Sequence, residues 1–177
     1  MATLEVITNT VVGAGGAASI TFSTIPQTYQ HLMVISSARS QRTGARWDGS
    51  TMRFNGESSG NNQSNVTLFN VGAAPTGTGE TDGNRVSYLF DSPAADALAD
   101  QFGASVVYFP NYRWGEFKKV IGWSASSNSS GSASDYGNTL ATGSWRSTSA
   151  VTSIYIAAGV TGFVEHSTFT LYGINSA

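Results

Sequence analysis

Residues Gly143–Ile174 read GSWRSTSAVTSIYIAAGVTGFVEHSTFTLYGI, and this stretch decides the fold class. It contains two runs in which apolar and polar residues alternate, Val151–Ile156 and Thr168–Ile174, separated by a glycine-containing turn region. Alternation with a period of two, built from β-branched and aromatic residues, is typical of antiparallel strands with one buried face. The sequence therefore predicts that the chain ends in two strands of a β-sheet protein.

Similar short segments occur along the rest of the chain. Further strands are predicted at Thr3–Val12, Ala18–Ser23, Tyr29–Ser37, Thr51–Asn55, Asn65–Val71, Arg85–Phe90, Ala104–Phe109, Lys119–Ser124 and Thr139–Trp145. Turn pairs such as Asn55-Gly56 separate them, because Asn and Gly tolerate the positive φ of tight turns. Many short strands with glycine-rich turns predict an all-β fold, an antiparallel β-sandwich of the jelly-roll type.

Three local expectations refine this prediction. Tyr29–Ser37 is dense in apolar residues, which suggests a strand buried on both faces. Residues 93–101 are rich in alanine and follow Ser92, a possible N-cap, so they form either one short helix or a loop. Residues 72–84 are rich in Gly and Thr and are expected to form a long loop.

The 177 residues are expected to fold as a single domain, residues 1–177. Residues 1–15 are a possible N-terminal arm within it. The alternating pattern of Met1–Val12 shifts at Ile7, so this segment is expected to be able to reach a neighbouring subunit and add a strand there.

Composition narrows the classes of function. The chain has no cysteine, which excludes disulfides, thiolate metal sites and cysteine nucleophiles. Its formal net charge is −2, so we expect neither nucleic acid nor a membrane surface as a partner. Charged residues make up 11% of the chain, against a usual share of about 25%. A hydroxyl-rich and weakly charged surface is common among extracellular β-proteins and virus particle proteins.

A search for catalytic chemistry finds little. The two histidines, His31 and His166, are far apart in sequence and form no metal-ligand pattern. No nucleophile elbow, zinc-protease motif or phosphate-binding loop occurs. Asp48 and Asp82 precede glycines, so turn geometry alone explains them. We therefore expect no enzyme activity, no catalytic residue, no metal and no cofactor.

Aromatic and basic residues are better candidates for contact with a partner. Large amphipathic rings and arginine are common anchors of interfaces, and exposed tryptophan can also stack on sugars. The predicted contact residues are Arg39, Arg42, Arg46, Trp47, Tyr112, Arg113 and Trp114. Trp123 and Trp145 fall inside predicted strands and are expected to belong to the core. A solvated loop face is the alternative for the arginines.

Several segments, taken in order, resemble a family of tailed-bacteriophage particle proteins. They are ITFSTIPQTYQHLMVISSAR (residues 20–39), MRFNGESSG (52–60), VYFPNYRW (107–114), GSWRSTSAVTSIYI (143–156) and STFTLYGI (167–174). The resemblance spans about residue 18 to residue 174. It implies a virion structural protein with a β-sandwich fold, assembled in the cytoplasm of a host bacterium. It does not distinguish head decoration from tail fibre or baseplate.

Two functions from different classes follow from this resemblance. The first is a capsid decoration or cement protein, which binds the major capsid protein and stabilises the assembled head, with a homotrimer as the expected oligomer. The absence of heptads or a shaft repeat favours it over a tail fibre. The alternative is a tail-associated or head-fibre module that binds host receptors or glycans through Trp47, Trp114 and the Ser/Asn-rich loops.

Overall fold

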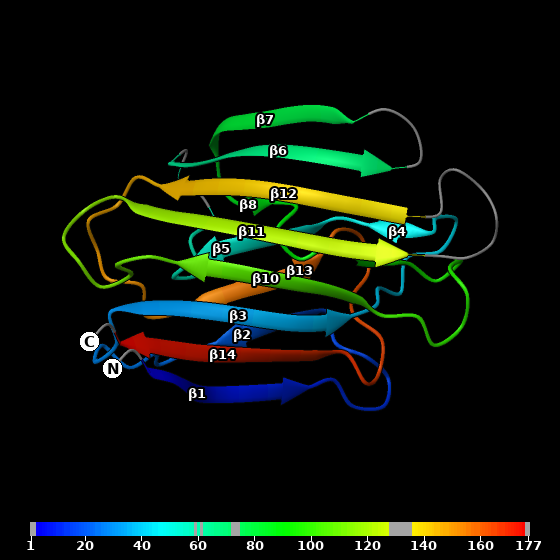
Figure 1. The fold of residues 1–177 in the computed structure, drawn as a ribbon, viewed down its shortest axis with the longest axis horizontal. Helices are drawn as coiled ribbons and strands as arrows, with labels where there is room; N and C mark the ends of the chain where they lie inside the picture. The colour runs from blue at the N-terminus through cyan, green and yellow to red at the C-terminus, as the bar shows by residue number, and fades with distance from the viewer. Residues whose placement is uncertain (1–2, 59, 61, 72–74, 128–135, 176–177) are drawn as a thin grey trace.

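The alternating segments of the sequence become strands in the computed structural model of the chain (Figure 1). The structure describes residues 3–58, 60, 62–71, 75–127 and 136–175, and this part of the chain contains strands and no helix. The strands are β1 (Thr3–Val11), β2 (Ser19–Phe22), β3 (His31–Ala38), β4 (Trp47–Asp48), β5 (Ser50–Phe54), β6 (Gln63–Val71), β7 (Thr76–Gly83), β8 (Val86–Ser87), β9 (Ser92–Pro93), β10 (Gly103–Phe109), β11 (Lys118–Ser127), β12 (Tyr136–Trp145), β13 (Ile154–Ala158) and β14 (Thr168–Asn175).

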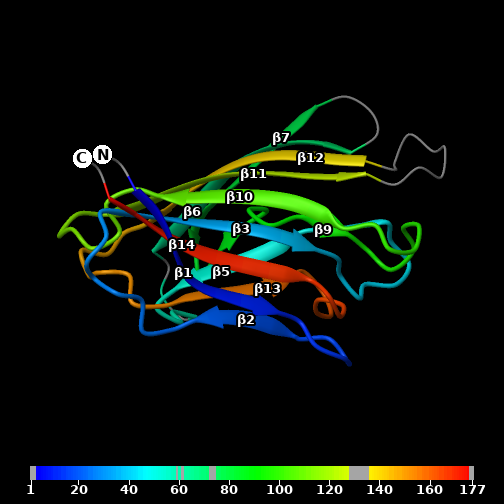
Figure 2. The ribbon, with the colours of Figure 1, turned by 60° about the horizontal axis from the view of Figure 1, so that its bottom comes forward.

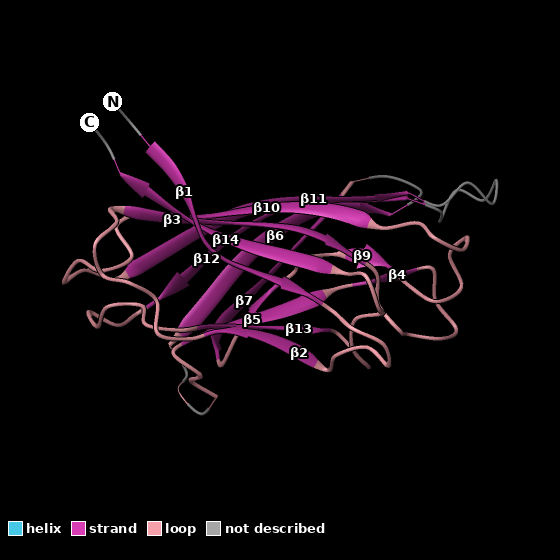
Figure 3. Ribbon diagram, turned by 90° about the horizontal axis from the view of Figure 1, so that it is seen from below, coloured by secondary structure: helices cyan, strands magenta, loops and turns pink. Residues whose placement is uncertain are grey.

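Two antiparallel sheets pack face to face as a sandwich. The large sheet has eight strands in the order β1-β14-β3-β10-β11-β12-β6-β7, and the small sheet has four in the order β2-β13-β5-β8. Figures 2 and 3 show the small sheet lying beneath one face of the large sheet. The two-residue strands β4 and β9 form a separate pair. The predicted antiparallel sandwich is therefore confirmed.

The pairings explain why the fold is of the jelly-roll type. The chain behaves as one long hairpin whose two halves pair throughout: β1 with β14, β2 with β13, β3 with β10, β4 with β9 and β5 with β8. Rolling such a hairpin distributes its strands over two sheets, as in a jelly roll. Two further hairpins, β6–β7 and β11–β12, are inserted into the roll and widen the large sheet by four strands.

The core fills the space between the sheets. Phe54 of the small sheet lies at its centre, with its ring 5.3 Å from the stacked indole of Trp145 and 6.0 Å from the edge-on ring of Phe109. Asn55 and Gly56, which follow Phe54, both have positive φ, as the sequence predicts for this turn. The predicted core position of Trp145 is confirmed.

Strand predictions hold best where one face is buried. Both C-terminal strands form, although the first begins at Ile154 instead of Val151. The segment of residues 72–84 was wrongly expected to be a loop, because residues 76–83 form edge strand β7, paired with β6. β3 was wrongly expected to be buried on both faces. Its burial alternates along the strand, and Ile35 lies on the exposed face, because the small sheet covers only one side of the large sheet.

The possible helix at residues 93–101 is absent. Backbone N–H groups of Ala94, Ala95 and Asp96 donate to carbonyls of residues 42–46, and Arg39 binds carbonyls of residues 95–101. Partners from the preceding segment therefore satisfy the polar groups that a helix would pair internally. Tertiary contacts outweigh the helix propensity of the alanines.

The N-terminal segment forms an edge strand of the large sheet. β1 pairs with β14 of the same chain along its length, and the register shifts between Val6 and Thr8, where the sequence pattern changes. Residues 124–127 and 136–137 belong to β11 and β12, and residues 128–135 between them lie outside the described residues. In the described part of the chain, no helix has the length and hydrophobicity needed to cross a membrane.

Candidate interaction surfaces

The predicted contact residues do not gather at one place. Trp47 packs against Gly137 at one end of the large sheet. Tyr112, Arg113 and Trp114 follow β10 in the loop that leads to β11, at the opposite end of these strands (Figure 1). The sequence-predicted set therefore divides into two groups, which are separated by the length of β10.

Arg39 lies inside the protein and not on its surface. Its guanidinium group donates hydrogen bonds to the carbonyl oxygens of Ala95 (3.0 Å), Ala97 (2.9 Å), Leu98 and Gln101. The side chain thereby fixes the segment that follows β9 against the end of β3. Burial leaves Arg39 no surface with which to anchor a partner.

Tyr112 is also buried, and it positions the rest of its loop. Its hydroxyl donates to the Pro26 carbonyl, and its own carbonyl accepts a hydrogen bond from Val151 N at 2.9 Å. Lys118 anchors the far side of the loop through a 2.7 Å hydrogen bond from Nζ to the Trp114 carbonyl. Arg113 and Trp114 remain exposed, with 46% of Trp114 accessible. Of this group, these two residues are available for contact.

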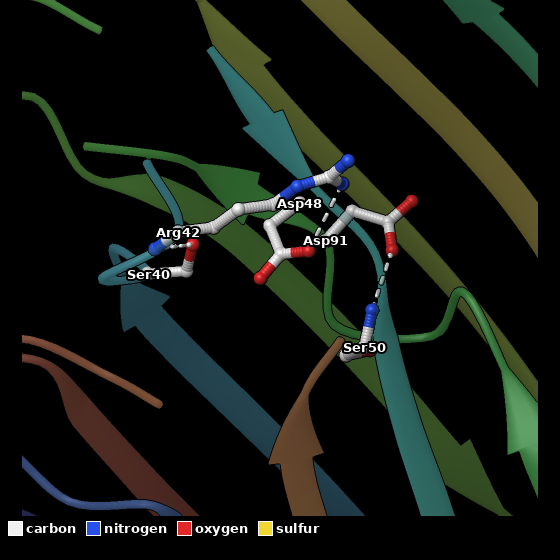
Figure 4. A network of polar contacts seen from close by, with 5 residues as sticks. All are labelled: Ser40, Arg42, Asp48, Ser50 and Asp91. Atoms are coloured by element: carbon white, nitrogen blue, oxygen red, sulfur yellow. Dashed lines mark hydrogen bonds and ion pairs between the residues drawn. The ribbon is translucent and has the colours of Figure 1, made fainter. Parts of the chain in front are cut away.

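A polar network lies beside Trp47 (Figure 4). Arg42 forms an ion pair with Asp48 at 3.4 Å, and the backbone N of Arg42 donates to the Ser40 hydroxyl at 3.2 Å. Burial raises the pKa of Asp48, whereas the hydrogen bond from Ser40 and the nearby Arg42 act against this rise. Arg42 is therefore tied to the protein's own carboxylate.

Asp91 continues this network into the interior. One carboxylate oxygen accepts a 2.6 Å hydrogen bond from the Thr139 hydroxyl, and the other accepts a bond from Ser50 N at 3.3 Å. Burial is the main reason that the pKa of Asp91 rises to about 7, and the negative charge of Asp48 adds to this rise. No pattern in the sequence marks this carboxyl group, because its burial depends on β12 packing over it.

The outer face of the large sheet carries several exposed apolar side chains. Its strands alternate, so one set of side chains enters the core and the other faces solvent. We call the exposed set the outer apolar patch, and it consists of Ile35, Val66, Leu68, Ile121, Trp123 and Leu140. Each of these residues is between 37% and 62% exposed. The expectation that Trp123 belongs to the core is wrong, because it points to the uncovered side of β11.

The strand register makes this patch continuous. Leu68 lies opposite Leu140, and Leu140 lies opposite Trp123, on three adjacent strands. Trp123 in turn pairs with Val106, which pairs with Ile35 on β3. From typical side-chain areas, the patch exposes roughly 500 Å² of apolar surface, a size that is often functional on a monomer.

The same face has almost no charge. Five of the six central strands (β14, β3, β10, β12 and β6) contain no Asp, Glu, Lys or Arg, and β11 contains only Lys118 and Lys119 at its start. Depletion of charge together with exposed aromatic and aliphatic residues is the composition of an interface centre. The sequence analysis did not predict this apolar face. The alternation in β6 and β12 was a usable signal, because it places Leu68 and Leu140 on the side of their strands that does not face the core.

No metal centre emerges from the charged residues. Within residues 3–175, excluding the undescribed segments, no three His, Asp or Glu side chains gather as a metal-binding group. The chemistry available on these surfaces is therefore hydrophobic contact on the outer face and guanidinium contacts near Trp47.

Comparison with known protein families finds no match, and no curated protein matches the sequence. Among solved structures, the chain is weakly similar to a chain of desmodium yellow mottle tymovirus, with a TM-score of 0.25 and 9% identity over 100% of this chain and 90% of that chain. It also aligns with infectious bursal disease virus, Gt strain, with a TM-score of 0.16 and 11% identity over 98% of this chain and 39% of that one.

A third similarity is to the VP2 subviral particle of infectious bursal disease virus, with a TM-score of 0.15 and 12% identity over 98% of this chain and 40% of that one. All three are virus structures, but TM-scores this low carry no argument about function. The comparisons and the structure together support an all-β antiparallel sandwich with weak similarity to proteins of virus particles.

Proposed function

We propose that this chain is a non-enzymatic structural protein of a tailed-bacteriophage virion, and specifically a decoration protein that binds the major capsid protein on the assembled head. The observation that carries the proposal is the charge-poor outer apolar patch. A surface of this kind is costly to leave in water and gains free energy when another protein covers it. On an assembled head, the major capsid protein and neighbouring copies of this chain are the surfaces that cover such a patch.

We further propose that the chain assembles as a homotrimer. Leu4 and Val6 on edge strand β1 form a second exposed apolar region, at the opposite edge of the same sheet from Leu68. Two separate apolar regions suit a heterologous contact, in which one region of each copy meets the other region of the next. Such contacts form closed rings, trimers among them, when the rotation between copies closes, whereas a dimer uses one self-complementary patch.

Replacing Leu68 and Trp123 together with serine tests the proposed role of the patch. Both side chains are about half exposed, so the double variant is expected to keep the melting temperature of the wild type. An aromatic anchor such as Trp123 contributes about 2 kcal/mol or more at the centre of an interface and burial of Leu68 about 1.5 kcal/mol or more, so association is expected to weaken by at least about 100-fold. Sedimentation velocity over a concentration series measures this change as conversion of trimer to monomer.

Leu98→Ser is the matched control, because Leu98 is similarly exposed but lies in the loop after β9. It is expected to sediment as the wild type does. A wild-type chain that remains monomeric at all concentrations contradicts the trimer.

The copy number per virion, measured by quantitative mass spectrometry, tests the location of the protein in the particle. Hundreds of copies support head decoration, and a few to a few tens contradict it.

A further inference from the structure

A pocket beside Trp47 carries more positive than negative charge. It has a volume of about 420 Å³, within the size range of small-molecule sites. Three arginines line it, Arg42, Arg53 and Arg85, whereas Asp48 is the one carboxylate among its lining residues. Since Asp48 is already paired with Arg42, the charges of Arg53 and Arg85 decide what the pocket attracts.

Arg53 and Arg85 lie next to each other on the outer side of the small sheet. β5 and β8 pair through Thr51 with Ser87 and Met52 with Val86, so Arg53 and Arg85 each follow directly on the last of these pairs, and both line the same pocket. Like charges at opposing positions destabilise a sheet. In the described part of the chain, neither arginine has an acidic partner at ion-pair distance. An anion between them would relieve this repulsion.

Arg53 is held in place where it lines the pocket. Its guanidinium carbon lies 5.4 Å from the centre of the Tyr155 ring on the neighbouring strand, a cation–π contact that limits its motion. Its Nε atom is buried and donates to no acceptor among the described residues. Because this atom is closed to solvent, an anion entering the pocket is attracted by the guanidinium charge of Arg53, which lines the pocket, and not by a hydrogen bond from Nε.

Aromatic rings form part of the wall of this pocket. Trp47 and Tyr88 line the pocket and stack with ring centres 6.0 Å apart and planes 8° from parallel. Tyr88 has a φ of 66°, which is rare for a bulky residue, and its backbone N donates to the Ser50 carbonyl at 2.9 Å. Strained backbone of this kind is retained where the position of a side chain matters.

We propose that this pocket binds a sugar that carries a carboxylate. The carboxylate lies between Arg53 and Arg85, and the sugar ring contacts Trp47, whereas the Tyr88 ring is already stacked between Trp47 and Phe69 and supports the indole. The hydroxyl groups of Thr51 and Ser87 also line the pocket and serve as partners for sugar hydroxyls. The combination of paired guanidinium groups, an aromatic wall and hydroxyl groups in a concave site favours an acidic sugar over a flat protein contact. The inference is independent of the proposed role in the capsid.

Titration of the full-length protein with glucuronic acid tests the proposal, with glucose and inorganic phosphate as the comparison ligands. Binding is followed by the NMR signal of the Trp47 indole N–H, assigned with Trp47→Phe. A monosaccharide of this size is expected to bind with a Kd on the order of 1 mM, and glucose and phosphate at least about tenfold more weakly.

Arg53→Gln and Arg85→Gln are each expected to weaken glucuronic acid binding by about tenfold or more. Arg113→Gln, at an exposed arginine at the other end of the sheet, is expected to leave it unchanged.

Three results would overturn the proposal. Equal affinity for glucose and glucuronic acid removes the role of the carboxylate. Equal affinity for phosphate and glucuronic acid reduces the site to a general anion site without recognition of the sugar. Binding that survives both Arg53→Gln and Arg85→Gln, in variants whose melting temperature matches the wild type, places the ligand elsewhere.

Discussion

Replacing Arg39 with methionine is expected to destabilise the protein by about 3 kcal/mol, which lowers the melting temperature of a domain of this size by roughly 6–12 °C. Methionine fills much of the space of the arginine stem but donates no hydrogen bond. Four carbonyl oxygens, from Ala95, Ala97, Leu98 and Gln101, then lose their charged donor. The segment must open to water or leave these groups unsatisfied, and either outcome costs free energy.

Thermal unfolding followed by circular dichroism measures this loss, with Arg113→Met as the control at an exposed arginine. Hydrogen exchange adds a local readout, because amides of residues 94–97 are expected to exchange faster in the variant. Arg39→Lys is expected to recover part of the stability, since lysine keeps the charge but cannot reach four carbonyls with a rigid fork. A melting temperature of Arg39→Met within 2 °C of the wild type, a margin within the effect of an ordinary surface change, contradicts the structural role.

Replacing Asp91 with asparagine is expected to stabilise the protein at alkaline pH. The pKa of Asp91 rises from 3.8 to about 7 in the folded protein. Between these two values, the folded protein holds a proton on Asp91 that the unfolded chain has lost, so stability decreases as the pH increases. The loss of folding free energy that comes from ionising Asp91 is complete above pH 7. At about 1.4 kcal/mol per pH unit, this loss amounts to a few kcal/mol.

Asparagine removes this titration but retains an oxygen to accept the bond from Ser50 N. The melting temperature of Asp91→Asn is therefore expected to exceed that of the wild type at pH 8.5 and to approach it at pH 5. Melting curves at intervals between these values measure the difference. Asp96→Asn, at an exposed carboxylate, is expected to show no such pH-dependent difference. A variant that is less stable than the wild type at every pH contradicts the inferred cost of the ionised carboxylate.

The strands were predictable because their signal is local. A strand with one buried face must alternate, and Thr168–Ile174 shows this whatever its partner is. β7 was not predictable in the same way. It is an edge strand of Gly, Thr and acidic residues that is exposed on both faces, so no alternation marks it, and pairing with β6 is what makes it a strand.

The candidate contact residues were harder to predict, because the type of a residue does not determine whether it lies in the core or on the surface. Arg39 and Arg53 are equally basic in the sequence, yet Arg39 is buried among carbonyls, whereas Arg53 lines a pocket. Trp123 and Trp145 both lie within strands, yet Trp123 faces solvent and Trp145 stacks on Phe54. For the tryptophans, the outcome depends on which side of the strand the second sheet covers, and for Arg39 it depends on the segment of residues 95–101 that folds around its guanidinium group.

The sequence by itself determined that this protein is an all-β antiparallel sandwich with a weakly charged surface, because alternation and composition are properties of the chain alone. The tertiary structure decided which apolar rows are covered. A small sheet of four strands covers one face of a sheet of eight, so half of the alternating side chains of the large sheet remain on its open face. It also placed Arg53 beside Arg85, because only the pairing of β5 with β8 brings these residues together.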